Sequence, residues 1–290
     1  GAILGGTSSA VVIPLVKQLK LQESAKTILV LESALSDVLC IVFVLALIQA
    51  YTSDGIKIGT IIGNIISSFT LASLLGLVSA ILWSVLLSRV RTINNSMFTT
   101  PAFVFVIYGI AESLGFSGAI AALAFGITLA NIDRFRIRIV QKIVNSGLNT
   151  FNDTEKQFFS EIVFLLKTFF FVFIGISIQF TNGWALLFGF FITVVIYLLR
   201  IPVVKFSIYE PLPTIDLTIM STMVPKGLAA AVLANLPVQY NLPGGEMIRD
   251  LTYSVILTSI ILTSILIPVL GKVPSVSAFY GSIIRKGRKR

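Results

Sequence analysis

Long apolar runs, each of about 20 residues, recur along the whole of this 290-residue chain. A run of that length, wound as a helix, crosses a hydrocarbon core of roughly 30 Å. No water in that core can satisfy backbone groups, and no run alternates as barrel strands do, so the runs predict helices. Charged residues are 12% of the chain, well below the share of about 25% in soluble domains. We therefore expect an all-α polytopic membrane protein.

The apolar runs predict about nine spans, at residues 1–17, 25–50, 56–87, 97–112, 116–131, 158–179, 184–204, 213–236 and 248–271. Between the spans, Lys and Arg gather on alternate connections and in the tail, whereas only Lys57 and Arg249 lie on the opposite side. By the positive-inside rule the basic side is cytoplasmic. The first span then runs inward and the C-terminus is cytoplasmic.

Two polar stretches lie outside the spans. The connection at about 131–157 predicts either a basic helix along the membrane surface or a solvated cytoplasmic loop. The tail at 273–290 is basic and is expected to lie on anionic headgroups. We expect one transmembrane domain at 1–272 followed by this tail, in the cell membrane. Because the opening segment is already a span without a signal peptide, we also expect the later part of a longer protein.

Several classes of function conflict with the composition. Cys40 is the single cysteine and the chain has no histidine, which excludes a disulfide within the chain and argues against a zinc site. The net charge of +9 is explained by membrane orientation and lipid headgroups, so we expect no nucleic-acid partner. No cofactor is expected.

Six of the ionisable residues within the predicted spans or near their ends are the candidates: Glu32, Asp37, Lys226, Glu112, Lys167 and Arg200. A charge at the centre of a membrane helix costs about 2.5–3.5 kcal/mol on insertion scales. Such residues usually face a wet, protein-lined interior and mark ion pathways or proton relays. The first three are therefore the strongest functional candidates.

Asp37 shares a helix with several polar neighbours. At 100° per residue, Ser33 and Asp37 lie on one face, while Glu32 and Ser36 lie on a neighbouring one. Hydroxyl and carboxylate oxygens suit a hard cation, and burial favours the protonated form of a carboxyl group. Cation and proton would then compete at Asp37. The alternative is that Asp37 and Glu32 are structural hydrogen-bonding residues.

Two spans contain helix breakers. GAILGGTSSAVVIP opens the chain, and MVPKGLAAAVL surrounds Lys226 with Pro225 and Gly227. Interrupted helices in corresponding positions indicate a secondary transporter with its site near the midplane. We expect a cation site from Thr7, nearby backbone carbonyls and Asp37.

Lys226 is expected to neutralise a carboxylate, with Glu32 as the better partner because it does not share the face of Asp37. The alternative is a lysine that reaches the interface. Lys167 is interpreted as such a lysine and Arg200 as an anchor at the basic side. Glu112 is expected in an outward funnel or in solvent. The small residues of FSGAIAALAFG indicate close helix packing.

The stretches GAILGGTSSAVVIPL and LVLESALSDVLCIVF resemble the paired central spans of the monovalent cation:proton antiporter superfamily, the sodium/proton and potassium/proton exchangers. The resemblance continues through YGIAESLGFSGAIAALAFGITLAN, FLLKTFFFVFIGI and MVPKGLAAAVLANLP. It implies inverted repeats, two discontinuous helices that cross at the midplane, and a homodimer. It also implies further helices before residue 1, and hence an N-terminally truncated chain.

The resemblance assigns roles to single residues. Asp37 matches the aspartate that binds cation and proton alternately, and Thr7, Ser33 and Glu32 match residues around that ion. Lys226 matches the basic residue of the second broken helix. Family members commonly have Asn or Asp before the key aspartate, where this chain has Ser36. Because serine does not ionise, electroneutral exchange is expected.

The predicted function is secondary exchange of Na⁺ or K⁺ for protons across a membrane, without an enzymatic step. Two alternatives remain from the residues alone: a cation channel and a sodium-coupled solute symporter. Against the symporter, no second cluster of polar residues suits an organic ligand.

Overall fold

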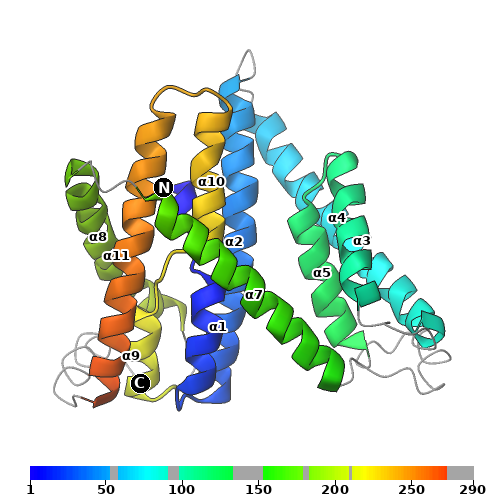
Figure 1. Cartoon of the computed structure of the whole chain (residues 1–290), viewed down its shortest axis with the longest axis horizontal. Helices are drawn as coiled ribbons and strands as arrows, with labels where there is room; N and C mark the ends of the chain where they lie inside the picture. The colour runs from blue at the N-terminus through cyan, green and yellow to red at the C-terminus, as the bar shows by residue number, and fades with distance from the viewer. Residues whose placement is uncertain (53–57, 91–97, 133–152, 179–182, 209–210, 273–290) are drawn as a thin grey trace. The chain divides into compact units, whose positions relative to one another are not determined.

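The structure is a computed structural model that describes residues 1–52, 58–90, 98–132, 153–178, 183–208 and 211–272. These residues form helices and connecting loops, with no strand among them. Figure 1 shows the helices. The predicted tail at 273–290 and most of the loop at 131–157 lie outside the described residues; α7 begins at Asp153, within that loop.

The all-α prediction is confirmed. In chain order the helices are η1 (Ala2–Leu4), α1 (Ser9–Gln18), α2 (Glu23–Thr52), α3 (Ile58–Val90), α4 (Thr99–Ser113), α5 (Gly118–Ala130), α7 (Asp153–Ser177), α8 (Gly183–Ser207), α9 (Thr214–Thr222), α10 (Leu228–Gln239) and α11 (Gly245–Lys272). Five are long and apolar enough to cross a membrane: α2, α3, α7, α8 and α11. The first span, α5 and α10 are shorter apolar helical segments.

Large apolar side chains lie on the outside of these long helices. Phe164 and Phe169 of α7 are 71% and 73% exposed, and Phe206 of α8 is 70% exposed. In water such a surface would drive aggregation, whereas in lipid it is satisfied by acyl chains. The exposed surface therefore agrees with the membrane environment that the composition predicts.

The chain divides into two compact units. Unit 1 comprises Gly1–Val44 and Thr168–Arg290, and unit 2 comprises Leu45–Lys167. Both α2 and α7 run from one unit into the other, because their bounds include residues of each. The predicted single transmembrane domain at 1–272 stays a prediction.

Unit 1 holds both interrupted helices. In Figure 1, α1 and α9 occupy its lower half and α10 its upper half. Its main apolar core joins α1, α2, α8, α9 and α11 through buried residues such as Val12, Leu29, Val204, Met220 and Ile267. A second cluster joins α7, α10 and α11 around Ile174, Ala234 and Ile256. These cores surround the two breaks.

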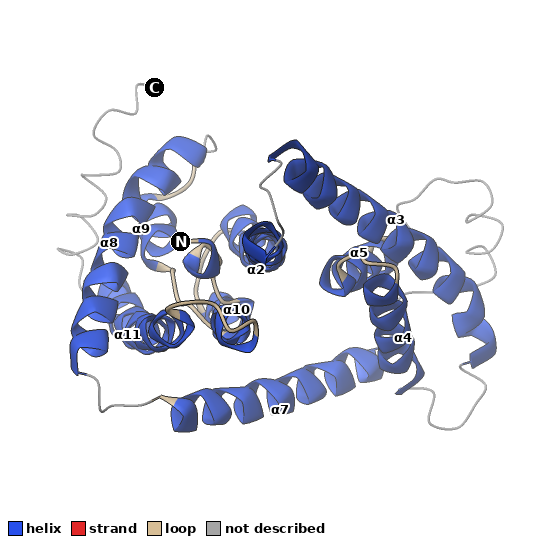
Figure 2. Ribbon diagram, turned by 90° about the horizontal axis from the view of Figure 1, so that it is seen from above, coloured by secondary structure: helices blue, strands red, loops and turns tan. Residues whose placement is uncertain are grey.

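Unit 2 is built on α3, α4 and α5, which lie beside one another in Figure 2. A Cβ on Gly76 of α3 would overlap the carbonyl oxygen of Ala121 in α5, so the two backbones approach closely. Trp83 of α3 stacks on Phe103 of α4, with ring centroids 4.4 Å apart, and its Nε1 donates to Thr100 at 3.1 Å. The predicted close packing of the small-residue segment in α5 is confirmed.

Candidate functional site

Two helix breaks meet within unit 1. The first is Gly5–Ser8, between η1 and α1, and the second is 223–227, between α9 and α10. The backbone N–H of Ser8 donates to the carbonyl of Pro225 at 2.7 Å. Helix ends leave backbone N–H and C=O groups without intrahelical partners, and here an N–H of the first break is paired with a carbonyl of the second. The glycine and proline residues thus predicted both interruptions correctly.

The approach of the breaks leaves no room for a side chain at residue 227. A Cβ added to Gly227 would overlap the Oγ of Ser8 and lie 2.6 Å from its Cβ. Ser8 itself is 2% exposed, and within the part of the chain that the structure describes its hydroxyl has no hydrogen-bond partner. This contact between the two breaks, called the crossing below, therefore depends on glycine in the second break for steric reasons.

Lys226 points into the first break. Its Nζ donates to the carbonyl of Gly6 at 2.7 Å, and the residue is 2% exposed. Its backbone N–H donates to Oγ of Ser259 in α11 at 3.0 Å. A buried ammonium requires such partners, and a carbonyl at a helix break supplies one. Lys226 is thus inside the protein, against the alternative of a lysine that reaches the interface.

The predicted ion pair of Lys226 with Glu32 is wrong. Both carboxylate oxygens of Glu32 accept from Arg200 of α8, with Nη2 to Oε2 at 2.6 Å. Nε of Arg200 also donates to the carbonyl of Met220 at 3.2 Å. A planar guanidinium matches a carboxylate in two places, which a lysine ammonium does not do.

Arg200 is therefore not a surface anchor. Its side chain is 10% exposed and that of Glu32 is 32% exposed, and both line a cavity of about 530 Å³ in unit 1. Direct binding of a cation by Glu32 would require the pair to open. The role of Glu32 in the cation site stays a prediction.

Asp37 lies against the first break. One carboxylate oxygen, Oδ2, accepts from the hydroxyl of Ser9 at 3.2 Å. A Cβ added to Gly6 would lie only 2.9 Å from the other oxygen, Oδ1. Cys40, one turn further along α2, also faces the break, since its sulfur would lie 3.1 Å from a Cβ at Gly5. The absence of side chains at these glycines lets α2 approach the break.

Three of the predicted site residues carry hydroxyl groups: Thr7, Ser33 and Ser36. The hydroxyl of Ser36 accepts from the backbone N–H of Thr7 at 3.1 Å and shares a hydrogen bond of 3.3 Å with its hydroxyl. Ser36 thereby attaches α2 to the first break. Ser33 is fully buried and donates to Val30 of its own helix at 2.9 Å. Thus Thr7, Ser36 and Asp37 come together, whereas the Ser33 hydroxyl bonds its own helix.

Sequence reasoning missed Ser9 and misread Arg200. Ser9 is the first residue of α1, a position at which a serine normally indicates a helix start rather than a ligand. Arg200 was assigned to a span end, but four apolar or small residues follow it and α8 continues to Ser207. That continuation was the available signal for a buried position.

Glu112 forms a hydrogen bond within unit 2. Oε1 of Glu112 accepts from the backbone N–H of Gly118 at 2.7 Å, at the start of α5 in unit 2. This hydrogen bond explains the residue structurally.

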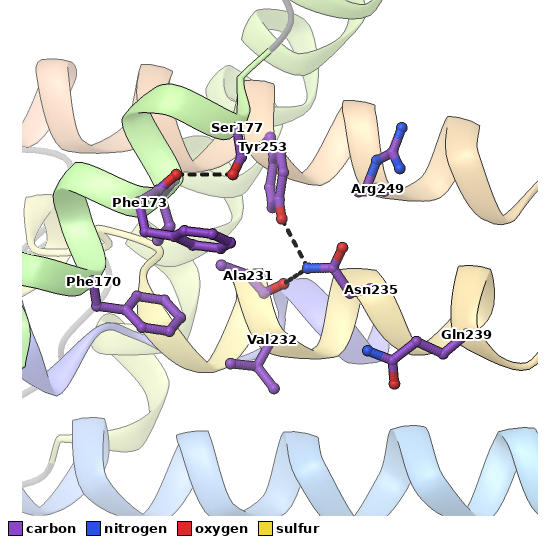
Figure 3. A pocket seen from close by; sticks show the side chains of 10 residues that line it. Phe170, Phe173, Ser177, Ala231, Val232, Asn235, Gln239, Arg249 and Tyr253 are labelled. Atoms are coloured by element: carbon purple, nitrogen blue, oxygen red, sulfur yellow. Dashed lines mark hydrogen bonds between the residues drawn. The ribbon is translucent and has the colours of Figure 1, made fainter.

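A cavity of about 560 Å³ lies between α7, α10 and α11 of unit 1, and Figure 3 shows its lining. Asn235 uses its amide to donate to the carbonyl of Ala231 at 2.9 Å and to the hydroxyl of Tyr253 at 2.8 Å. Arg249, which also lines it, pairs with Asp250. The residues lining this cavity include no carboxylate, so it suits a cation less well than the crossing does.

The first break and α2 bring oxygen atoms of several kinds into one region: the hydroxyl of Ser9 contacts the Asp37 carboxylate, the hydroxyls of Thr7 and Ser36 contact each other, and the carbonyl of Gly6 accepts from Lys226. Oxygen ligands suit hard cations rather than soft metals. Among the described residues, no group of three His, Cys, Asp or Glu side chains is arranged to hold a metal ion. The arrangement therefore favours a site with one titrating carboxylate. A comparison with protein-family models matches residues 1–273 to the family described as sodium/hydrogen exchanger, transmembrane.

Proposed function

Since the chain belongs to the sodium/hydrogen exchanger family, we propose that it exchanges Na⁺ or K⁺ for protons by competition of the two ions at Asp37. At the level of the family, the chain is a multi-pass integral membrane protein of a group that exchanges cations for protons, and such transporters need no cofactor. The observation that carries the finer proposal is the position of Asp37, against a helix break and beside hydroxyl oxygens.

The proposed cycle follows from the chemistry of that carboxylate. In its ionised form Asp37 binds a cation, and in its protonated form it does not. Binding of one ion therefore releases the other. Oxygens from Thr7, Ser33 and Glu32 are proposed to complete the site, which requires Ser33 to leave its bond to Val30 and Glu32 to leave its pair with Arg200. Lys226, held at Gly6, supplies a fixed positive charge near the site that offsets part of the negative charge.

We further propose that exchange is one-for-one. Ser36 occupies the place before Asp37 and its hydroxyl hydrogen-bonds Thr7, so it adds no second titrating group. With Asp37 as the one carboxylate that exchanges its proton for the cation, each cation displaces one proton and no net charge crosses the membrane.

The remaining parts of the proposal concern the whole protein. They are nine spans, inverted repeats whose two discontinuous helices cross at the midplane, a homodimer, a location in the cell membrane and a cytoplasmic C-terminus. The family match and the apolar helices support the multi-pass membrane protein that all five parts presuppose.

The test is a proton-movement assay in proteoliposomes that contain the purified chain and a pH-sensitive dye. We expect Na⁺ or K⁺ added to acid-loaded vesicles to restore the dye signal, with Li⁺ tested in turn. Asp37→Asn should reduce the rate to that of empty vesicles, because an amide neither releases a proton nor carries charge. The matched control is Asp250→Asn, an acidic residue at the start of α11.

Three outcomes would contradict the proposal. Exchange by Asp37→Asn at the wild-type rate would exclude Asp37 as the shared site. Conductance far above transporter turnover would favour a channel. A clear acceleration by an imposed membrane potential, at a fixed pH gradient, would contradict one-for-one exchange.

A further inference from the structure

Ser9 approaches Asp37 from the start of α1. Its hydroxyl donates to Oδ2 at 3.2 Å, while Gly6 lies close to Oδ1. We propose that Ser9 is a positioning and specificity-determining residue that favours the cation over the proton at Asp37. This inference rests on the proposed exchange at that carboxylate.

The hydrogen bond opposes protonation. A hydroxyl that donates to a carboxylate favours the ionised form, because it bonds the charged oxygen more strongly than the neutral one. Protonation of Asp37 at either oxygen therefore weakens this hydrogen bond, because the neutral carboxyl group is a poorer acceptor than the carboxylate. A hydrogen bond of this kind corresponds to about a tenfold change in an equilibrium constant.

The same hydroxyl does not oppose a cation. Two oxygens that bind one cation at roughly 2.4 Å, with an angle near 90°, lie about 3.4 Å apart. The separation of 3.2 Å between Oγ of Ser9 and Oδ2 of Asp37 is close to that value. When a cation binds both oxygens, the Ser9 hydroxyl turns its proton away from Oδ2 and faces the cation with a lone pair, so a contact with the cation replaces the hydrogen bond.

A change at residue 9 leaves the other ionisable side chains around the two breaks and on α2 in the sequence. They include Lys226 of the second break, Cys40 of α2, and Glu32 of α2 with its partner Arg200 of α8. A comparison of variants at residue 9 therefore isolates the hydroxyl. Ser84 provides a matched control, since it is a buried serine of α3 in unit 2 whose hydroxyl donates only to Ile81 of its own helix.

The experiment measures the half-saturating Na⁺ and K⁺ concentrations and the maximal rate of the full chain in proteoliposomes, across a series of pH values. For Ser9→Ala we expect the half-saturating concentration to rise about tenfold at acidic pH, and by less at alkaline pH where protons compete weakly. The maximal rate should stay within about twofold. Ser9→Thr, which keeps the hydroxyl, and Ser84→Ala should resemble the unmodified chain.

A purely structural role for Ser9 would lower the maximal rate without moving the half-saturating concentration, and that result would overturn the inference. So would an unchanged pH profile in Ser9→Ala. If Ser9→Ala fails to fold, Ser9→Cys replaces it, and we expect a smaller shift in the same direction because a thiol is a weaker donor. If the unmodified chain exchanges ions and Asp37→Asn does not, the proposed function stands even when the Ser9 variants contradict this inference. If the unmodified chain shows no exchange, both the proposed function and this inference are overturned.

Discussion

The two units bury different kinds of residue. At the centre of unit 1 lie a lysine, a carboxylate, an ion pair and several hydroxyls, around two helix breaks. In unit 2 the contacts between α3, α4 and α5 consist mainly of aromatic rings and small residues, such as Trp83 on Phe103 and Gly76 on α5.

This difference suggests different roles for the two units, with unit 2 contributing to stability and unit 1 to transport. The packing described between α3, α4 and α5 is apolar and aromatic, and it lowers the free energy of the fold of unit 2. The buried charges of unit 1 cost free energy unless each is paired, so their retention needs a reason other than stability. We expect changes at the crossing to affect exchange, and changes in unit 2 to affect the fold.

The largest effect is expected at Gly227. Gly227→Ala would drive a methyl group into Ser8 and shift one break against the other. Since displacements of about 1 Å reduce rates about 100-fold in other sites, we expect a loss of exchange of that size in proteoliposomes. Adding Ser8→Gly should restore part of the rate, because glycine removes the obstructing side chain and is tolerated at a helix N-cap.

The control for Gly227 is Gly126→Ala in α5, where a Cβ meets nothing within 4 Å. Exchange should be unchanged there. A double variant no better than Gly227→Ala alone would show that steric overlap with Ser8 is not the cause.

The ion pair of unit 1 comes next. Arg200→Met leaves Glu32 half-buried without its guanidinium partner, which we expect to lower the free energy of unfolding by about 3 kcal/mol. Denaturant titration in detergent micelles provides the measurement. Lys26→Met, which breaks an exposed pair with Glu23 on the surface of α2, should cost less than about 1 kcal/mol. Equal losses in the two variants would remove the distinction between the pairs.

In unit 2, Gly76→Ala should destabilise the packing of α3 on α5. A methyl group there would meet the backbone of Ala121 and the Cβ of Ala124, 2.8 Å away. Overpacking of this kind costs about 2 kcal/mol. We expect a lower unfolding temperature but an unchanged exchange rate per folded molecule. A loss of exchange without a change in unfolding temperature would contradict the assignment of exchange to unit 1 and of stability to unit 2.

The smallest effect is expected at Thr100. Thr100→Val removes the acceptor of the buried Trp83 indole N–H, and an unsatisfied donor costs about 1 kcal/mol. Thr70→Val is the control, because that exposed hydroxyl bonds only its own helix. If the two variants unfold at the same midpoint, the indole hydrogen bond contributes nothing to the free energy of unfolding.

Much of the fold could be predicted because its signals are local. Runs of apolar residues predicted the long helices, and glycine and proline predicted the breaks at Gly5–Ser8 and around Pro225. The position of Asp37 on α2 also followed from sequence. Local signals reach a few residues along one helix, where spacing fixes which side chains share a face.

The partners of the buried charges could not be predicted in the same way. Glu32 and Arg200 are 168 residues apart in the chain, and the helical period of α2 does not say which helix lies opposite. The choice of Lys226 as the partner used charge and the faces of α2 alone, without knowledge of which helix lies opposite Glu32.

The sequence by itself determined that this chain enters a membrane, where its helices break and which carboxylate is the strongest functional candidate. The reason is that lipid makes charges and helix breakers costly, so each is conspicuous in an apolar run. Only the tertiary structure decided that Lys226 binds a carbonyl of the first break, that Arg200 holds Glu32, and that Ser9 reaches Asp37. These contacts join distant segments, and they depend on how the helices pack around the crossing.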